Sequence, residues 1–223
     1  MQSLEAELEA ARSLAVDDLA DAIESIGFEC TRCGACCKGD DEDDHTATVF
    51  PDEVRALAAS DEYDGEYDWR DVARPMPYGL EDRDGDLEGE TFEWALQTDA
   101  CGDCVFYAED DDGTGACRAH DDRPLICRTY PFSVALAGTS QPMGEAVDEA
   151  GVVRAHECEG LGRDISRGDA EDLATALKER AIRELEEAIA VRDNYAPADP
   201  GPGEVVVHDS EGAKRVDGTP IDE

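Results

Sequence analysis

The arrangement of nine cysteines constrains this 223-residue chain more than any other feature of its sequence. Four of them stand within eight positions, as Cys30-x2-Cys33-x2-Cys36-Cys37. The others, in chain order, are Cys101, Cys104, Cys117, Cys127 and Cys158. A Cys-x2-Cys turn points both sulfurs at one ion, and the chain has two clear turns of this kind, one of them followed directly by Gly34. We therefore expect distant segments to meet at a cysteine centre.

The cysteine pattern favours metal binding over a disulfide framework. The number of cysteines is odd, and two of them are direct neighbours, which makes a poor structural bridge. The first residues, "MQSLEAELEAARSL", have neither the cationic start nor the apolar stretch of a secretory signal. In a reducing compartment such cysteines more often bind metal or take part in catalysis.

The neighbouring pair, Cys36 and Cys37, suggests how many sites to expect. In a helix, neighbouring side chains diverge by about 100°, and in a strand they face opposite ways. We therefore expect these two residues to serve two sites, or two metals of one polynuclear cluster, rather than one tetrahedral ion. Eight cysteines would supply two four-thiolate sites, with the crowded segment at the junction between them.

The sequence leaves the metal undecided between zinc and an iron–sulfur cluster. Zinc takes four thiolates in a closed structural site. The spacing of the first three cysteines matches a bacterial ferredoxin run, but the ferredoxin continuation is missing. With either metal, a site of four thiolates carries net negative charge, which basic side chains nearby would offset. The alternative is that these basic side chains are ordinary surface residues. The basic residues close to cysteines are Arg32, Lys38, Arg118, Arg123, Arg128 and Arg163.

The composition predicts a thin apolar core under a highly charged surface. Leu, Ile, Val and Phe make up less than a fifth of the residues, a level typical of disordered chains when net charge is high. The net charge is −38, from 57 acidic and 19 basic residues spread over the whole length. Molar salt, where the Debye length is about 3 Å, would screen this repulsion. The surface is thus of the haloarchaeal type, and metal is expected to help hold the chain together.

The same charge limits the partners. A chain without a basic patch has no means of releasing counterions from nucleic acid, so we expect no nucleic-acid partner and no anionic membrane surface. No run of 18 apolar residues occurs, and we expect no membrane span and a cytoplasmic location. A protein partner is left open.

Hydrophobic periodicity predicts an α+β fold: a small, loop-rich, metal-stapled domain with N- and C-terminal helices around a cysteine centre. Helices are expected over residues 1–27, from Pro51, and from an N-cap at Asp169 to about Asn194. The expected strands are 91–96, 132–138 and 145–158, the last turning at 148–151, whereas 60–90 reads as loop. The expected domains are a helix at 1–27, a cysteine-cluster domain at 28–195, and a Pro/Gly-rich acidic tail at 196–223, with a hairpin near 205–207 or disorder.

Histidines add one alternative ligand. His156 stands two residues before Cys158 and is a candidate to replace a cysteine. We expect His45 to be solvated beside the acidic run, and His120 and His208 show no partner at metal or catalytic spacing. Tyr107, Tyr130 and Trp94 are expected in the core. The acidic runs lack the spacing of a calcium-binding loop.

Three separated motifs resemble one known family. "CTRCGACC" resembles the CxxCxxCC signature of the YkgJ-like cysteine-cluster family, a zinc- or iron-chelating domain. "CVFYAEDDDGTGACRAHDDRPLICRTYPF" and "CEGLGR" resemble its later segments, in the right order. The resemblance covers about residues 28–190. It implies that the metal-binding set is Cys30, Cys33, Cys36, Cys37, Cys104, Cys117, Cys127 and Cys158.

The resemblance also ranks the remaining motif residues. Supporting roles would fall to Arg123, Pro124, Arg128, Pro131 and Phe132. Cys101 lies outside the pattern and would be the odd thiol or a substitute ligand. The insert "EDDDGTG" and the Pro-rich tail depart from the pattern and look like surface elaboration.

Three functions follow from this sequence. The first is a metal-binding protein with two Cys-rich sites that are mainly structural or redox-active, without a defined substrate. The second is an iron–sulfur-dependent transferase, since some proteins that carry this domain are associated with flagellin lysine N-methylation. The third is metal delivery or redox sensing. An open coordination position would indicate chemistry, and four cysteines per metal would indicate structure.

Overall fold

The structure is a computed structural model that describes residues 3–39, 44–60, 67–83, 85–136, 144–147 and 151–221. By the contacts among its residues the chain divides into two compact units. Unit 1 contains residues 1–33 and 125–186, and unit 2 contains residues 34–124 and 187–223. Both units contain helices and strands, so the predicted α+β class is confirmed. The expected boundaries at residues 28 and 196 stay predictions, because contacts do not test which parts fold alone.

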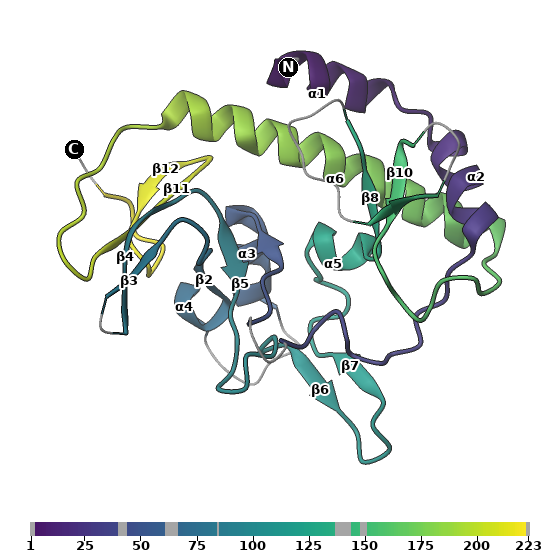
Figure 1. The fold of residues 1–223 in the computed structure, drawn as a ribbon, viewed down its shortest axis with the longest axis horizontal. Helices are drawn as coiled ribbons and strands as arrows, with labels where there is room; N and C mark the ends of the chain where they lie inside the picture. Colours follow the sequence, from purple (N-terminus) through teal and green to yellow (C-terminus); the bar gives the residue numbers. More distant parts are fainter. Residues whose placement is uncertain are drawn as a thin grey trace. The chain divides into compact units, whose positions relative to one another are not determined.

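Unit 1 is built from helices and one small antiparallel sheet (Figure 1). The sheet order is β8-β10-β9, which confirms the strands expected within 132–138 and 145–158. The expected turn at 148–151 lies mostly outside the described residues. The elements are α1 (Leu4–Ser13), α2 (Val16–Ile26), α5 (Leu125–Thr129), β8 (Phe132–Val134), β9 (Glu145–Ala146), β10 (Val153–Ala155) and the part of α6 (Arg167–Asn194) up to Glu186.

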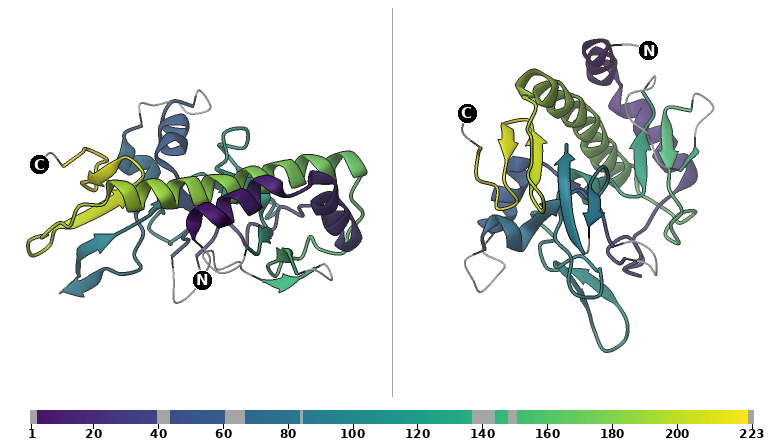
Figure 2. Two further views of the ribbon diagram at one scale, coloured as in Figure 1. Left: turned by 90° about the horizontal axis from the view of Figure 1, so that it is seen from above. Right: turned by 60° about the vertical axis from the view of Figure 1, so that its left-hand side comes forward.

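The N-terminal segment is helical, as predicted, but forms two helices rather than one. The helix breaks at Leu14 and Ala15, whose backbones are extended, with ψ of 131° and 126°. Lys178 of α6 donates a hydrogen bond of 2.7 Å to the Leu14 carbonyl, which the end of α1 leaves without a helical partner. Both helices run alongside α6 (Figure 2), and an ion pair of 2.9 Å joins Arg12 to Glu186.

The start of α6 differs from the sequence prediction. The helix begins at Arg167, and the Ser166 hydroxyl accepts a hydrogen bond of 3.1 Å from the Asp169 N–H. Ser166 therefore caps the helix, and the predicted cap, Asp169, lies inside the first turn. The buried stripe that periodicity predicts is present in part. Its buried members are Ala170, Ala174, Ala176, Leu177, Ala181 and Leu185.

Unit 2 contains two sheets and a hairpin. One sheet has the order β12-β11-β4-β3, in which β11 pairs parallel to β4; the other has the order β1-β5-β2; and β6 pairs with β7. The predicted helix at Pro51 is confirmed as α3. The elements are β1 (Thr48–Val49), α3 (Pro51–Ala58), α4 (Trp69–Val72), β2 (Ala73–Pro75), β3 (Glu81–Arg83), β4 (Asp86–Thr91), β5 (Trp94–Leu96), β6 (Tyr107–Glu109), β7 (Gly115–Cys117), β11 (Val205–Asp209) and β12 (Gly212–Lys214).

In unit 2 the structure settles one segment that the sequence left undecided and corrects one predicted strand. The segment 60–90, loop-like in composition but without a predicted fold, holds α4, β2, β3 and most of β4, although 61–66 and 84 lie outside the described residues. The expected strand 91–96 is interrupted at Phe92 and Glu93, so that β4 and β5 belong to different sheets. These strands depend on partners distant in sequence, which local patterns do not report.

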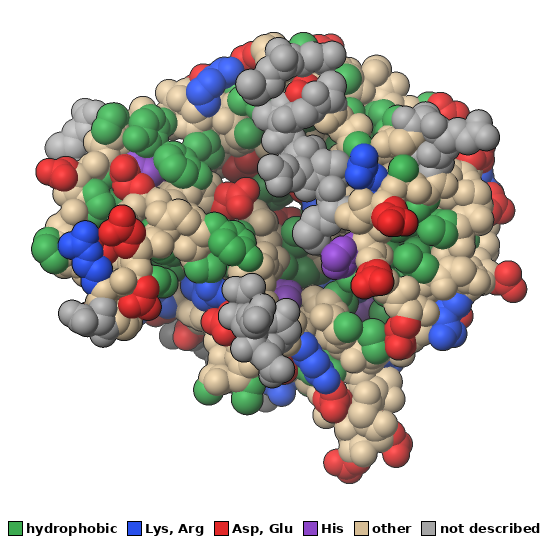
Figure 3. All heavy atoms as spheres, in the orientation of Figure 1, with side chains coloured by type: hydrophobic (Ala, Val, Ile, Leu, Met, Phe, Trp, Pro, Cys, Tyr) green, Lys and Arg blue, Asp and Glu red, His purple; other side chains and the backbone are tan. Residues whose placement is uncertain are grey.

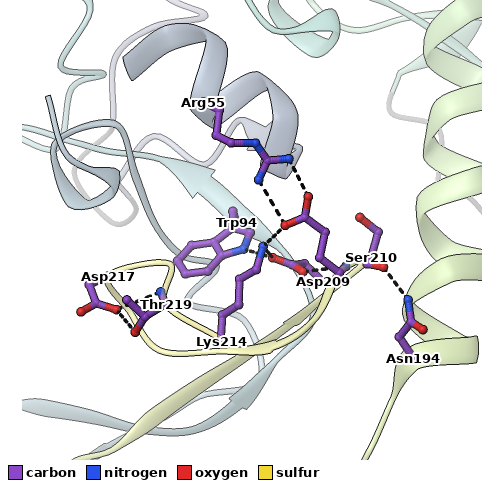
Figure 4. A network of polar contacts seen from close by, with 9 residues as sticks. Arg55, Trp94, Asn194, Asp209, Ser210, Lys214, Asp217 and Thr219 are labelled. Carbon is purple, nitrogen blue, oxygen red and sulfur yellow. Dashed lines mark hydrogen bonds and ion pairs between the residues drawn. The ribbon is translucent and has the colours of Figure 1, made fainter. Parts of the chain in front are cut away.

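A buried ion pair anchors the C-terminal hairpin of unit 2 (Figure 4). The side chains of Lys214 and Asp209 are 3% and 4% exposed, and Lys214 Nζ lies 2.8 Å from an Asp209 carboxylate oxygen. Trp94 donates its indole N–H to Asp209 at 2.8 Å, and Glu211 accepts from both Lys214 and Arg55. The hairpin is therefore part of the core of unit 2, and Trp94 is buried as predicted.

Candidate metal centre

All nine cysteines lie among the described residues, and all are thiols rather than disulfides. The eight cysteines of the predicted metal set divide equally between the two units. Unit 1 has Cys30, Cys33, Cys127 and Cys158; unit 2 has Cys36, Cys37, Cys104 and Cys117. The crowded segment is thus divided after Cys33, and its two halves join different sets.

The first cysteines of unit 2 are carried by a turn that requires glycine. Gly34 has φ +78°, a left-handed conformation, and its carbonyl accepts a hydrogen bond of 2.8 Å from the Cys37 N–H. A Cβ at Gly34 would lie 2.2 Å from the Tyr107 Oη and 2.6 Å from Cζ of that ring. The glycine that the sequence singled out is therefore needed both for the bend and for the approach of Tyr107.

The side chains of Cys36 and Cys37 converge instead of diverging. Their sulfurs are 3.7 Å apart. The expectation that neighbours diverge holds for helices and strands, and it is wrong here because the pair belongs to the turn after Gly34. With metal–sulfur bonds of about 2.3 Å, the edge of a tetrahedral thiolate site is about 3.8 Å. Both sulfurs are therefore spaced as two ligands of one ion.

Cys104 and Cys117 lie in the same neighbourhood. The Cys104 N–H donates to the Cys37 carbonyl at 2.8 Å. Burial, with smaller contributions from the charges of Cys117 and Cys36, raises the pKa of Cys104 to about 11, although hydrogen bonds from the backbone oppose this. Cys117 ends β7, where it pairs with Tyr107 of β6. Four thiols of unit 2 thus gather around the turn at Gly34.

The pKa values of Cys36 and Cys104 depart from the ordinary value of a thiol, and Cys36 is the more acidic of the two. Its hydrogen bond with Cys37 lowers its pKa from 9.0 to about 7; burial opposes this, and the charge of Arg123 contributes to it. Arg123 therefore fits the charge compensation expected from the sequence. Lys38 does not, because it pairs with Glu109 at 2.7 Å and lies 5.1 Å from the centre of the Tyr107 ring.

Cys101 belongs to the second Cys-x2-Cys turn but differs from Cys104 in its surroundings. Cys101 is exposed, whereas Cys104 is 7% exposed. The Asp99 carboxylate accepts from the N–H groups of Cys101 and Asp103, at 2.8 and 3.2 Å, and so closes the turn. Cys101 stays a candidate for either the odd thiol or a substitute ligand.

His45 lies against this centre, which the sequence reading did not foresee. It is half-buried rather than solvated, and its ring Nε2 donates a hydrogen bond of 3.1 Å to the Cys36 carbonyl. Burial lowers the pKa of His45, and because a carbonyl only accepts, Nε2 carries a proton. Nδ1 is buried without a hydrogen-bond partner among the described residues. In the sequence His45 directly follows the acidic run, and that position alone suggested that its side chain is solvated.

In unit 1, the first two cysteines follow a segment that pairs with the segment after Cys158. Phe28 forms an antiparallel bridge with Leu161, and the Glu29 N–H donates to the Gly160 carbonyl at 3.0 Å. The Thr31 hydroxyl bonds the Glu159 carboxylate. Arg32, between the two cysteines, has φ +59°, the left-handed bend of this turn. Cys30 and Cys33 are exposed beside this bridge.

The segment after Cys127 contacts the segment before Cys158. Cys127 lies in α5, and Tyr130, just beyond this helix, donates from its hydroxyl to the Glu157 carbonyl at 2.8 Å. The His156 N–H donates to the Pro131 carbonyl at 2.9 Å. The four cysteines of unit 1 are thus carried by segments that contact one another. His156 packs edge-on against Tyr130, at 5.9 Å between centroids.

The remaining histidines lie elsewhere. His120 is exposed, and its Nδ1 lies 3.3 Å from Asp121. His208 is buried and bonds Glu90 at 2.8 Å, a partner 118 residues away that sequence spacing does not indicate. Within the described ranges, no three or more His, Cys, Asp or Glu side chains lie as close together as ligands of a bound ion. Within each unit, the segments that carry the cysteines therefore contact one another, and among the thiols the Cys36 and Cys37 sulfurs have the spacing of two ligands of one ion.

The outer surface agrees with the composition. Acidic side chains are spread over the face drawn in Figure 3, and Lys and Arg are fewer. The acidic insert forms the turn of the β6–β7 hairpin, where the Asp110 carboxylate accepts from the N–H groups of Asp112 and Thr114. Across the described part of the chain, every helix is too short or too polar to cross a bilayer.

Comparison with known proteins agrees with the cysteine arrangement. The family model CxxCxxCC, described as "Putative zinc- or iron-chelating domain", matches residues 29–159, more than half of the chain. No curated protein and no solved structure gives a significant match. The matched range contains all nine cysteines. The chain belongs to the CxxCxxCC family of zinc- or iron-chelating domains.

Proposed function

We propose that the protein holds two metal ions, one in each unit, through its two sets of four cysteines. The ligands would be Cys30, Cys33, Cys127 and Cys158 in unit 1, and Cys36, Cys37, Cys104 and Cys117 in unit 2. The observation that carries the proposal is the 3.7 Å separation of the Cys36 and Cys37 sulfurs, because it matches the edge of a tetrahedral thiolate site.

The same separation favours a metal that binds both Cys36 and Cys37 over a four-iron cluster. In a four-iron cluster each cysteine binds a different iron, which would hold neighbouring sulfurs farther apart than one tetrahedral edge. Two cysteines on one ion need the short separation observed for Cys36 and Cys37. Zinc is the metal most often bound by four thiolates in a closed structural site, and we propose zinc for both centres.

The metals would act as structural supports. Unit 2 is made of strands of two to six residues and helices of four to eight residues, besides the end of α6, so long loops connect its elements. A structural zinc ion contributes on the order of 10 kcal/mol to folding. Each proposed centre would join the Cys30–Cys37 segment to cysteines much later in the chain. The fold would then depend on metal to hold its loops.

The test is metal content per chain in paired variants. We expect two zinc ions in the wild type, one in Cys33→Ser, one in Cys37→Ser, and none or nearly none in the double variant. Cys101→Ser is the matched control and should keep two. Loss of both ions in either single variant would contradict independent centres. A wild type without metal would overturn the proposal.

A second role, redox-controlled release of metal, is favoured by Cys36. This thiol is exposed, and its pKa of about 7 makes it largely thiolate above neutral pH. Hydrogen peroxide would oxidise the thiolates of Cys36 and Cys37 to a disulfide; the peroxide O–O bond breaks, two protons are taken up, and two waters form. We expect one zinc ion to leave per disulfide formed. Oxidation without zinc release would exclude this role.

The charge distribution supports a setting of high salt. We propose that the protein works in a cytoplasm of molar salt, where screening relieves repulsion among its acidic side chains. The melting temperature should rise as KCl increases from 0.1 to about 3 M. A melting temperature that stays constant over this range would contradict the proposal.

A further inference from the structure

We propose that His45 is a positioning residue of the unit 2 centre, which fixes the Cys36–Cys37 turn against the Cys101–Cys104 turn. The inference rests on the proposed metal site and adds a residue to it that is not a cysteine. His45 acts through the backbone of Cys36 and not as a ligand.

The backbone and ring of His45 reach three different segments. Its N–H donates to the Gly102 carbonyl at 2.9 Å, within the second cysteine turn. Its ring Nε2 donates to the Cys36 carbonyl at 3.1 Å, and its own carbonyl accepts from Arg74 Nη2 at 2.8 Å. His45 therefore links the two cysteine turns and ties both to β2, in which Arg74 lies.

The hydrogen bond from the His45 ring fixes the second of the two carbonyls of Cys36 and Cys37. The Cys37 carbonyl is held by the Cys104 N–H at 2.8 Å, and the Cys36 carbonyl is held by His45. With both carbonyls engaged, the two peptide planes are fixed, and the two side chains leave the turn toward the same side. This accounts for sulfurs 3.7 Å apart on neighbouring residues.

The chemistry of the ring suits this role. A carbonyl only accepts, so Nε2 of the ring must carry a proton and act as the donor. Hydrogen bonds behind the ligands commonly change metal affinity about 10- to 100-fold when they are removed. A residue that holds the backbone of a ligand is expected to have an effect in this range.

The experiment compares two substitutions in full-length Cys33→Ser, which would retain only the unit 2 centre. His45→Gln keeps an N–H donor near the position of Nε2, and His45→Phe keeps the ring volume without a donor. We expect zinc affinity, measured by competition with a chelator, to fall about 10- to 100-fold for His45→Phe and less than about 3-fold for His45→Gln. His120→Phe, an exposed histidine of the same unit, is the control and should change nothing.

Cobalt spectra separate positioning from ligation. The cobalt-loaded protein should show four-thiolate absorption with His45 and with Gln at this position. A spectrum with one nitrogen and three thiolates would make His45 a ligand and overturn the inference. Equal loss of affinity in both variants would overturn it too, because the donor that glutamine keeps would then have no effect. Unchanged affinity in His45→Phe would also overturn it. Failure of Cys33→Ser itself to bind zinc would refute the proposed function instead, and a cooperative urea-unfolding transition like that of the wild type would show that His45→Phe folds.

Discussion

Replacing Gly34 by alanine should damage the unit 2 centre more than the same replacement at Gly113. Both glycines lie in unit 2 and have nearly the same left-handed backbone, with φ of +78° and +81°. A Cβ at Gly34 would lie 2.2 Å from the Tyr107 Oη, whereas a Cβ at Gly113 would meet nothing within 4 Å. The pair therefore separates the cost of the backbone from the cost of the contact.

The magnitudes follow from these two contributions. A non-glycine residue in the left-handed region costs about 1–2 kcal/mol, which should be the whole effect of Gly113→Ala. Overpacking adds about 1–3 kcal/mol at Gly34. Tyr107 yields little, because its hydroxyl bonds Glu109 at 2.6 Å. If the free energy of this overpacking is subtracted from the free energy of zinc binding, the zinc affinity of the unit 2 centre falls about 5- to 150-fold.

The assay is chelator competition for zinc affinity, with urea unfolding of the zinc-loaded protein for stability. Tyr107→Ala should restore zinc affinity in Gly34→Ala. Tyr107→Phe should not, because ring atoms at 2.6 and 2.8 Å would still clash with the new Cβ. Equal losses in Gly34→Ala and Gly113→Ala would refute the reasoning that Tyr107 and the glycine turn together position the thiols.

Two further predictions concern stability and pH. Lys214→Met should lower the free energy of unfolding by about 3–5 kcal/mol, because it leaves Asp209 charged and buried without its cation. The control is Arg70→Met, which removes an exposed ion pair and should lower the free energy of unfolding by less than about 1 kcal/mol. Equal losses of the two variants in urea unfolding would contradict this prediction. In metal-free protein the pKa of Cys36 lies below its ordinary value, so its contribution to stability is complete above pH 9 and is lost as pH falls through about 7. Alkylation with mass-spectrometric mapping should accordingly modify Cys36 half-maximally near pH 7 and Cys104 only near pH 11, and the reverse order would be inconsistent with the structure.

Much of the helical structure could be predicted from sequence because it depends on local periodicity. The stripe of α6 and the start of α3 at Pro51 follow from spacing and from helix-start signals. The break after α1 could not be predicted, because neither glycine nor proline marks it and Lys178, which bonds Leu14 there, is 164 residues away. The partners of the β4–β11 pair are also far apart in sequence, and the pairing follows no local pattern.

The members of the metal site stay a prediction, which the resemblance to the cysteine-cluster family implies. The structure adds the division of the crowded segment after Cys33, which depends on tertiary contacts. The expected divergence of Cys36 and Cys37 came from regular backbone geometry, which the turn at Gly34 does not have. His45 gave no signal in sequence, because its role depends on two turns that only the fold brings together.

The number and kind of metals per chain test the central claim most directly. Native mass spectrometry of the full-length protein, purified without added metal or chelator, would weigh the bound metals with the chain intact. The account predicts two zinc ions per chain and no sulfide. A mass that corresponds to an iron–sulfur cluster would contradict the single-ion centres, and a metal-free chain with paired thiols would contradict the account as a whole.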